Sequence, residues 1–220
     1  MSKVKFEVTK IHCVQETRGE WGRDEIYCVA MPLIGNTQED IIDFKEIDPK
    51  NIKGKLLPGK VSKVENRVKH GHVWKPTMDP IEIDTGDDTA LCVLFFLFEE
   101  DNGEIREELI KRFATGTWPI KLPDDPQYDG ILEKIIERFS EDIVATIGEK
   151  WPQIVLAILK SVLTVAPGVM KELRKDDVID TRVIGYDLMD TDTCYLPREY
   201  NLAGRGGKYK VGIQLSVCDG

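Results

Sequence analysis

The sequence has 220 residues, 41% of them hydrophobic, which is enough apolar material to build the core of one large domain or two small ones. Its formal net charge of −9 excludes the broad basic face that binding to a phosphate backbone requires, so we do not expect a nucleic-acid partner. The same acidity leaves two means of attachment to an anionic surface: a bound metal cation, or the locally basic stretch from Lys53 to Lys75.

Five cysteines are present, and they show no CxxC pair and no zinc-like spacing. The pattern therefore predicts neither a disulfide framework nor a structural zinc site. The first residues, MSKVKFEVTKIH, also lack the charged-then-apolar layout of a signal peptide. On this ground we expect a cytoplasmic protein, with export by a route that needs no cleaved signal as the alternative.

Two strands are predicted near the start of the chain. Residues 4–14, VKFEVTKIHCV, alternate between apolar and polar side chains, and residues 25–35, EIYCVAMPLIG, form an apolar run. The stretch between them is crowded with acidic residues, among them Glu16, Glu20 and Asp24. We therefore expect the two strands to pair as a hairpin with a charged tip.

The strongest strand signal lies in the middle of the chain. Residues 40–75 contain IIDF and KLLPGKVSKV, which are compatible with short strands. The apolar run ALCVLFFLFEE at residues 90–100 is bounded by the turn signals DTGDD and EDNGE. Because this run is not interrupted by polar residues, it predicts a strand that is buried on both faces.

Two helices are predicted after residue 118. Apolar residues recur at three- and four-residue spacing between Asp129, a suitable N-cap, and Gly148, a suitable stop. The second run, WPQIVLAILKSVLTVAP at 151–167, is apolar almost all round. It is shorter than the about 20 residues of a membrane span and carries Lys160 near its middle. A buried core helix is the first interpretation, and insertion into a membrane after a conformational change is the alternative.

The chain returns to β-structure beyond Pro167. We expect a strand at VMKEL, an acidic turn at RKDDVIDT (174–181), a strand at RVIGYDLMD, a charged and glycine-rich stretch through NLAGRGG, and a last strand at KYKVGIQLSV (208–217). This order predicts a mainly β fold with an α insertion, an antiparallel β-sandwich that carries an inserted helical hairpin. We expect a single domain over residues 1–220, with the sandwich built from 1–118 and 168–220 and the helical insertion at 129–167.

None of the common catalytic signatures occurs in the chain. There is no GxxxxGKS or GxxxxGKT phosphate loop, no HExxH, no GxSxG, and no GxGxxG between a strand and a helix. We therefore do not expect an enzyme.

Acidic residues gather instead in three predicted turns at strand ends. Hard cations such as Ca²⁺ take six to eight oxygen ligands, commonly carboxylates from loops. Three such loops at one end of a sandwich would form a cup for a cation, while the alternative is that the acids are simply solvated. The turns contain Glu16, Glu20, Asp24 and Glu25; Glu99, Glu100 and Asp101; and Asp176, Asp177 and Asp180. The candidate metal ligands among them are Glu20, Asp24, Glu25, Glu99, Asp101, Asp176, Asp177 and Asp180.

Three segments resemble, in the same order, the signatures of C2-type β-sandwiches. They are GRDEIYCV at 22–29, VLFFLFEED at 93–101 and RKDDVIDTRV at 174–183. The resemblance implies an eight-stranded antiparallel sandwich of a family in which many members bind calcium through apical loops and dock on phospholipid. It implies loop ligands at Glu25, Glu99, Asp101 and Asp177. The family has no long helical insert between the second and third segments.

Two functions are expected on these grounds. The first is a non-catalytic, C2-like binding module that uses Ca²⁺ in its acidic apical loops to engage a phospholipid membrane or a protein partner. The second is a membrane-active effector or toxin component whose apolar helical hairpin inserts into lipid. The oligomeric state and the identity of the partner stay open.

Overall fold

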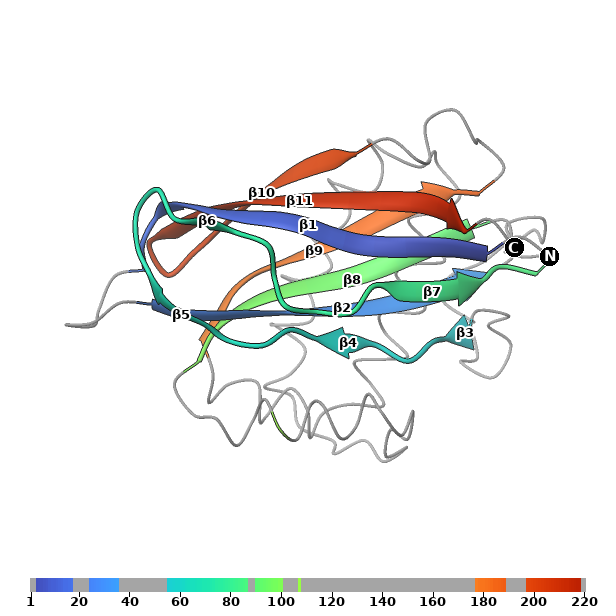
Figure 1. Cartoon of the computed structure of the whole chain (residues 1–220), viewed down its shortest axis with the longest axis horizontal. Coiled ribbons are helices and arrows are strands. Elements are labelled where there is room, and N and C mark those ends of the chain that lie inside the picture. Colours follow the sequence, from blue (N-terminus) through green and yellow to red (C-terminus); the bar gives the residue numbers. More distant parts are fainter. Residues whose placement is uncertain are drawn as a thin grey trace, which may run out of the picture.

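Two antiparallel β-sheets pack face to face (Figure 1). The computed structural model describes residues 3–17, 24–35, 55–86, 90–100, 107, 177–188 and 197–218. Within these residues the strands are β1 (Lys3–Gln15), β2 (Asp24–Gly35), β3 (Lys55–Leu56), β4 (Lys60–Val61), β5 (Glu65–Val68), β6 (Val73–Trp74), β7 (Ile81–Asp84), β8 (Ala90–Glu99), β9 (Asp177–Asp187), β10 (Arg198–Gly204) and β11 (Gly207–Cys218).

The two sheets divide the long strands between them. Sheet A has the order β10-β11-β1-β6, and β7 also pairs with β1. Sheet B has the order β3-β2-β8-β9, and the short strands β4 and β5 also pair with β2. All the strand pairs are antiparallel. The predicted antiparallel β-sandwich is therefore confirmed.

The central strand of sheet A, β1, keeps a single apolar face by means of an irregularity. Val8 is buried before a register shift between Val8 and Lys10, and Ile11 and Cys13 are buried after it. An extra residue at a bulge moves the alternation of side chains by one position. The strand therefore presents apolar side chains to the core along its whole length and polar ones to solvent.

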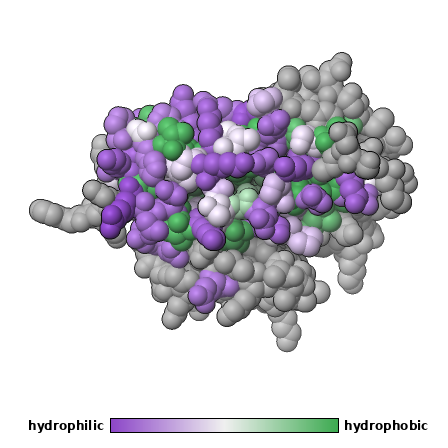
Figure 2. Space-filling view, in the orientation of Figure 1, coloured by the Kyte–Doolittle hydropathy of each residue, from purple (hydrophilic) through white to green (hydrophobic). Residues whose placement is uncertain are grey.

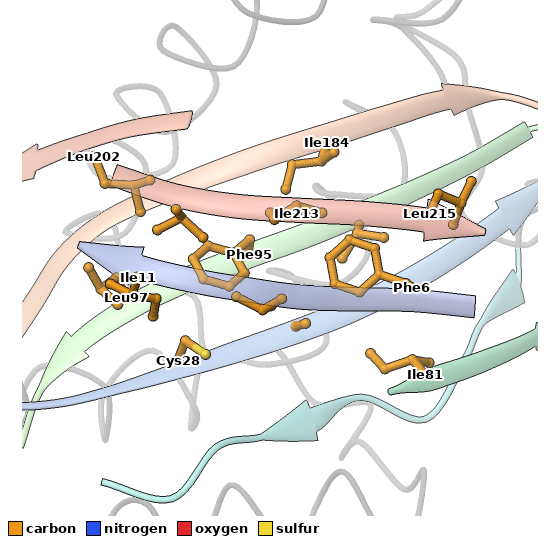
Figure 3. Close-up of a cluster of buried hydrophobic side chains, with 14 of the residues drawn as sticks. Phe6, Ile11, Cys28, Ile81, Phe95, Leu97, Ile184, Leu202, Ile213 and Leu215 are labelled. Carbon is orange, nitrogen blue, oxygen red and sulfur yellow. The ribbon is translucent and has the colours of Figure 1, made fainter. Parts of the chain in front are cut away.

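The hydrophobic core lies between the sheets (Figure 3). Phe6 of β1 and Ile213 of β11 come from sheet A, and Phe95 of β8 and Ile184 of β9 come from sheet B. Each of these side chains is at most 1% exposed. Burial of such a side chain contributes about 1.5–3 kcal/mol, so this layer supplies most of the hydrophobic stabilisation of the sandwich.

β8 is buried on both faces, as its sequence predicts. Phe95 and Leu97 point into the core between the sheets, whereas Leu94 and Phe98 point the other way and are still only 1% exposed. β8 pairs with β2 on one side and with β9 on the other. Strands β8 and β9 are thus neighbours in sheet B, although residues 100–176 separate them in the sequence.

The predicted hairpin between residues 4–14 and 25–35 is wrong. Both segments form strands, but β1 pairs with β11, β6 and β7 in sheet A, and β2 pairs with β8 and the short strands in sheet B. The side-chain patterns account for this separation. β1 has one polar face and suits a sheet with a solvated side, while β2 is apolar on both faces and takes a central position beside β8.

Two further predictions in the C-terminal part are corrected. The predicted acidic turn at 174–181 is wrong from Asp177 onward, because Asp177 begins β9 and Asp180 lies inside it. The glycine-rich stretch NLAGRGG is mostly strand β10. It ends in a two-residue turn at Arg205 and Gly206, whose φ angles of 50° and 83° fit the tight turns that join paired strands.

Several predictions fall outside the described residues. They include the helical insertion at 129–167 with both of its helices, the strand at VMKEL and the segment IIDF. The prediction of one domain over residues 1–220 also stays a prediction.

Candidate functional site

Two acidic residues from sheet B point into the space between the sheets, at one end of the sandwich. Asp24 is the first residue of β2, and Glu99 is the last residue of β8, where it pairs with Ile26. Both follow the alternation of the core-facing side chains of their strands. They are 6% and 7% exposed, respectively, so both carboxylates are buried. Burial of this kind is costly unless hydrogen-bond donors compensate for the lost water.

Thr17, just beyond the end of β1, joins these two carboxylates. Its backbone N–H donates a hydrogen bond of 2.9 Å to Asp24 Oδ2. Its hydroxyl Oγ1 donates to Glu99 Oε1 at 2.8 Å. Two carboxylates from different strands therefore converge on one residue.

Tyr209 of β11 adds a donor from the opposite sheet. Its hydroxyl donates to Asp24 Oδ2 at 2.7 Å. Burial, together with this hydrogen bond and the charge of Asp24, raises the pKa of Tyr209 well above its ordinary value, so the hydroxyl stays protonated and remains a donor. We call the group of Thr17, Asp24, Glu99 and Tyr209 the apical mouth.

The buried thiol of Cys13 lies next to the apical mouth. Burial is the main reason that the pKa of Cys13 rises to about 11, and the negative charge of Asp24 contributes to the rise. A thiol with such a pKa stays protonated at neutral pH and is a poor nucleophile. Cys13 therefore has the properties of a core residue and not those of a reactive site.

His70, in the turn after β5, forms two hydrogen bonds with residues at the end of β1, next to the apical mouth. The backbone N–H of His70 donates to Glu16 Oε1 at 2.7 Å. Its ring Nδ1 lies 2.6 Å from the carbonyl oxygen of Val14. Because a carbonyl oxygen can only accept, Nδ1 carries the proton in this contact. The contacts of Glu16 and His70 are consistent with a structural role for both.

Of the remaining predicted ligands, the structure describes Glu25, Asp177 and Asp180. Glu25 is exposed, and as the residue after Asp24 on a strand it points to the opposite face. Asp177 pairs with Glu99 in the register of sheet B, at the same end as the apical mouth. Glu20, Asp101 and Asp176 lie outside the described residues.

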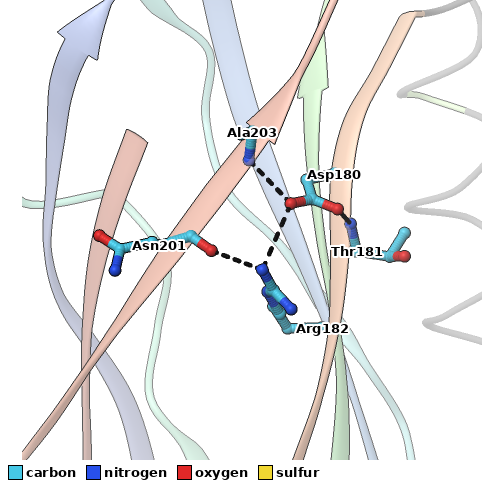
Figure 4. Close-up of polar contacts among 5 residues, drawn as sticks. All are labelled: Asp180, Thr181, Arg182, Asn201 and Ala203. Atoms are coloured by element: carbon cyan, nitrogen blue, oxygen red, sulfur yellow. Dashed lines mark hydrogen bonds and ion pairs between the residues drawn. The ribbon is translucent and has the colours of Figure 1, made fainter. Parts of the chain in front are cut away.

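Asp180 lies apart from the apical mouth, in the contact between β9 and β10 (Figure 4). Its Oδ2 accepts a hydrogen bond of 2.8 Å from the backbone N–H of Ala203, and its Oδ1 accepts one of 2.8 Å from Thr181. Arg182 Nη2 is 3.8 Å from the same Oδ2. Asp180 pairs with Leu97 and not with the end of β8. Its Oδ2 joins β9 to β10 and its Oδ1 is bound to the next residue of β9. Its position inside β9 corrects its placement in an apical turn.

The donor chemistry of the apical mouth fits a hard cation, but the described residues do not complete a site. Asp24 and Glu99 offer carboxylate oxygens, the ligands that Ca²⁺ prefers. Within the part of the chain that the structure describes, no group of three or more His, Cys, Asp or Glu side chains is placed to hold a metal ion. The two carboxylates fall short of the six to eight oxygens that Ca²⁺ takes.

Sequence reasoning identified the two carboxylates but missed their partners. Thr17 is a polar residue at a strand end, and Tyr209 occupies an apolar position in an alternating strand. Neither position marks its residue as a partner of Asp24. Tyr209 lies 185 positions away from Asp24 in the sequence, so only the packing of the two sheets brings them together.

No protein-family model matches the sequence. A search of curated protein sequences finds no relative. Among solved structures, the chain is similar to a C2 domain of plant extended synaptotagmin 1, with 8% sequence identity and a TM-score of 0.38, over 100% of this chain and 97% of that chain. That domain belongs to the family that the three sequence segments resemble. A likeness at this level carries no argument about function, and the sandwich rests on the strand pairing of this chain.

Proposed function

We propose that the chain is a non-catalytic, C2-like binding module that holds Ca²⁺ at the apical mouth and uses the loaded end to engage a phospholipid membrane or a protein partner. The observation that carries the proposal is the convergence of Asp24 and Glu99 on Thr17. Asp177 begins β9 beside Glu99, which brings a third carboxylate-bearing residue to the same end of sheet B.

The electrostatics of the mouth support a cation as its ligand. Two like charges that are both hydrogen-bonded to one residue, as these are, repel each other, and the repulsion is stronger at a buried position than in water. A divalent cation between the carboxylates replaces this repulsion with attraction. The segments 18–23 and 101–106 adjoin Thr17, Asp24 and Glu100, and in the proposal they supply the remaining oxygen ligands, Glu20 and Asp101 among them.

Calcium titration by calorimetry on chelator-stripped protein tests the proposal. We expect binding in the natural protein and its loss in Asp24→Asn and in Glu99→Gln. Glu25→Gln is the matched control, because Glu25 is exposed and points away from Asp24. Retained binding in this control would also assign the β2 ligand to Asp24 and not to Glu25.

Two further readouts separate lost binding from lost folding and identify the surface that is engaged. Ca²⁺ at about 100 times its Kd should raise the free energy of unfolding by about 2.7 kcal/mol in the natural protein and not in the two site variants. Co-sedimentation with phosphatidylserine vesicles should then require Ca²⁺. The absence of a heat signal at millimolar Ca²⁺ in a correctly folded protein would overturn the calcium proposal.

The second expected function, a membrane-active effector or toxin component, stays a prediction. The segments 131–147 and 151–167 on which it depends lie outside the described residues. Within the part of the chain that the structure describes, no helix is long and apolar enough to cross a membrane. Leakage of a dye from vesicles separates the two functions, because a module that only docks leaves the vesicles sealed.

A further inference from the structure

Tyr209 brings a polar atom into an otherwise apolar layer. Among the buried residues that sheet A contributes to the described core, it alone carries a side-chain oxygen. The other core residues of β11 are Val211, Ile213 and Leu215. A phenylalanine would satisfy the packing at this position, and a buried hydroxyl is costly unless it is hydrogen-bonded. The hydroxyl of Tyr209 is therefore explained by what it contacts and not by its contribution to the core.

Elsewhere, sheet A keeps its charged side chains at the surface. Lys10 pairs with Glu199 at 2.8 Å, and Lys210 lies 3.6 Å from the same glutamate. Each of these side chains is more than 40% exposed. Figure 2 shows hydrophilic residues over most of the described surface in this view. Tyr209 thus departs from the pattern of its own sheet, because its polar group points inward to the apical mouth.

The hydroxyl of Tyr209 is held between an acceptor and a donor. It donates to Asp24 Oδ2 at 2.7 Å, and it is also hydrogen-bonded to the thiol of Cys13. Because the single proton of the hydroxyl is used on Asp24, the thiol is the donor in the second contact. All three residues are buried. A hydroxyl that is engaged on both sides cannot rotate freely, so its direction is set before any ligand binds.

Two donors fix the orientation of the Asp24 carboxylate through one of its oxygens. The backbone N–H of Thr17 and the hydroxyl of Tyr209 both donate to Oδ2, and neither bond uses Oδ1. One donor lies just beyond the end of β1 and the other lies on β11, so they hold the carboxylate from two directions. Oδ2 is then the structural oxygen of Asp24, and Oδ1 is the one left to face a cation.

We propose that Tyr209 is a positioning residue for the cation at the apical mouth: it holds Asp24 with Oδ1 presented as a ligand, and it couples the occupancy of the mouth to the contact between the two sheets. The inference rests on the proposed binding of Ca²⁺. A carboxylate that is already oriented needs less rearrangement when the cation binds. Removal of a hydrogen-bond partner of a metal ligand typically costs about 10- to 100-fold in metal affinity.

The coupling predicts an effect of Ca²⁺ on a strand that carries none of the candidate ligands. Asp24 begins β2 in sheet B, and Tyr209 lies near the start of β11 in sheet A. A cation bound to Asp24 immobilises the acceptor of the bond between them. Local opening of β11 then has to break a stronger restraint. Ca²⁺ should therefore slow hydrogen exchange at the start of β11.

Tyr209→Phe keeps the ring, removes the hydroxyl and tests the proposal in the full chain. Calorimetry should give a Kd for Ca²⁺ about 10- to 100-fold higher than that of the natural protein, with the same stoichiometry. Ca²⁺ should slow exchange at the start of β11 in the natural protein and not in the variant. Tyr186→Phe is the matched control, because Tyr186 is buried in the same core but pairs with Leu91, at the opposite end of β8 from Glu99. It should keep the natural affinity and the exchange response.

A spectroscopic readout distinguishes positioning from a general loss of stability. The near-ultraviolet absorption of a phenol responds to the charge of its hydrogen-bond acceptor. Ca²⁺ should therefore produce a tyrosine difference spectrum in the natural protein and in Tyr186→Phe, and this spectrum should be lost in Tyr209→Phe. Circular dichroism shows whether Tyr209→Phe is folded at the temperature of the titration. If it is not, the exchange response of β11 in the natural protein decides the question.

The possible failures can be told apart. Natural affinity in folded Tyr209→Phe would overturn the positioning role and leave the calcium proposal standing. Ca²⁺ binding to the natural protein without slower exchange at the start of β11 would overturn the coupling, again with calcium binding intact. The absence of Ca²⁺ binding in the natural protein would overturn the calcium proposal, and this inference with it.

Discussion

Thr17 shows how a single residue sets the electrostatics of the apical mouth. With one backbone N–H and one hydroxyl it donates to two buried carboxylates, Asp24 and Glu99, that come from different strands. Hydrogen bonds to charged groups contribute about 1.5–3 kcal/mol each. The residue therefore reduces the cost of keeping both charges close together in the absence of a cation.

The hydroxyl of Thr17 can be removed with little change in shape. We expect Thr17→Val to lower the free energy of unfolding by about 1–3 kcal/mol, because Glu99 loses a donor while staying buried. Thr17→Ser keeps the hydroxyl and should lie within about 0.5 kcal/mol of the natural protein. Urea unfolding, with the same dependence of the free energy of unfolding on urea concentration in each protein, measures the difference. Equal midpoints for the two variants would contradict the role assigned to the hydroxyl.

At the scale of elements, β9 and β10 are joined by side chains where their two sheets meet. Asp180 accepts from the backbone of Ala203, and Arg182 Nη2 donates to the carbonyl oxygen of Asn201 at 2.7 Å (Figure 4). Arg198 Nη1 donates to the carbonyl oxygen of Gly185 at 3.2 Å. Inward-pointing charges at sheet edges satisfy backbone groups that would otherwise be open to pairing with another chain.

Hydrogen exchange can follow the contact between β9 and β10 directly. We expect Asp180→Asn to speed exchange at the amides of Ala203 and Thr181, because an amide side chain offers one acceptor oxygen where the carboxylate offers two. Exchange in β1 and β8 should change little. Glu199→Gln, a change in a surface ion pair, serves as the control. Unchanged exchange at Ala203 in Asp180→Asn would show that the carboxylate is not what protects the amide.

Gly204 allows the backbones of β9 and β10 to approach closely. A Cβ atom at this position would lie 1.7 Å from the carbonyl oxygen of Ile179, which is backbone and cannot simply rotate away. We expect Gly204→Ala to cost about 3 kcal/mol or more in thermal or urea unfolding. Gly71→Ala is the comparison, since no atom lies within 4 Å of its Cβ and its φ of 80° limits the cost to about 1–2 kcal/mol. A smaller loss for Gly204→Ala than for Gly71→Ala would contradict this account.

At the scale of the whole molecule, buried thiols set the stability at alkaline pH. Burial raises the pKa of Cys28 from 9.0 to about 12. It also raises the pKa of Cys92, by more than that of Cys28. Above pH 9 the unfolded chain has lost protons that the folded chain still holds, so the free energy of unfolding falls as the pH rises. Each fully buried thiol contributes a slope of about 1.4 kcal/mol per pH unit.

Urea unfolding between pH 8 and pH 11 measures this slope. We expect the natural protein to lose stability steadily above pH 9, and Cys28→Ala to lose it less steeply whatever its stability at pH 8. Cys92→Ala should have a similar effect on the slope. A slope that is the same in all three proteins would show that these thiols do not titrate with folding.

Much of the fold could be predicted from local patterns, and the failures have a common cause. The strands β1, β2, β8 and β11 were predicted because their apolar residues alternate or run without interruption. The pairing of β1 with β2 was predicted wrongly, because adjacency in sequence does not show whether a connection stays in one sheet or crosses to the other. Asp180 was assigned to a turn, since an acidic residue at a sheet edge has the same local signature as one in a loop.

The sequence by itself determined a mainly β chain, the long strands, the apolar character of both faces of β8 and the presence of acidic residues at the ends of β2 and β8. These are local properties, set by which side chains follow one another. Only the tertiary structure decided that Asp24 and Glu99 meet at Thr17 and Tyr209, that Asp180 joins β9 to β10, and that one sheet has a solvated face and the other an apolar one. Such properties depend on which distant strands become neighbours, and hydrophobic burial between two sheets selects those neighbours only when the whole chain is folded.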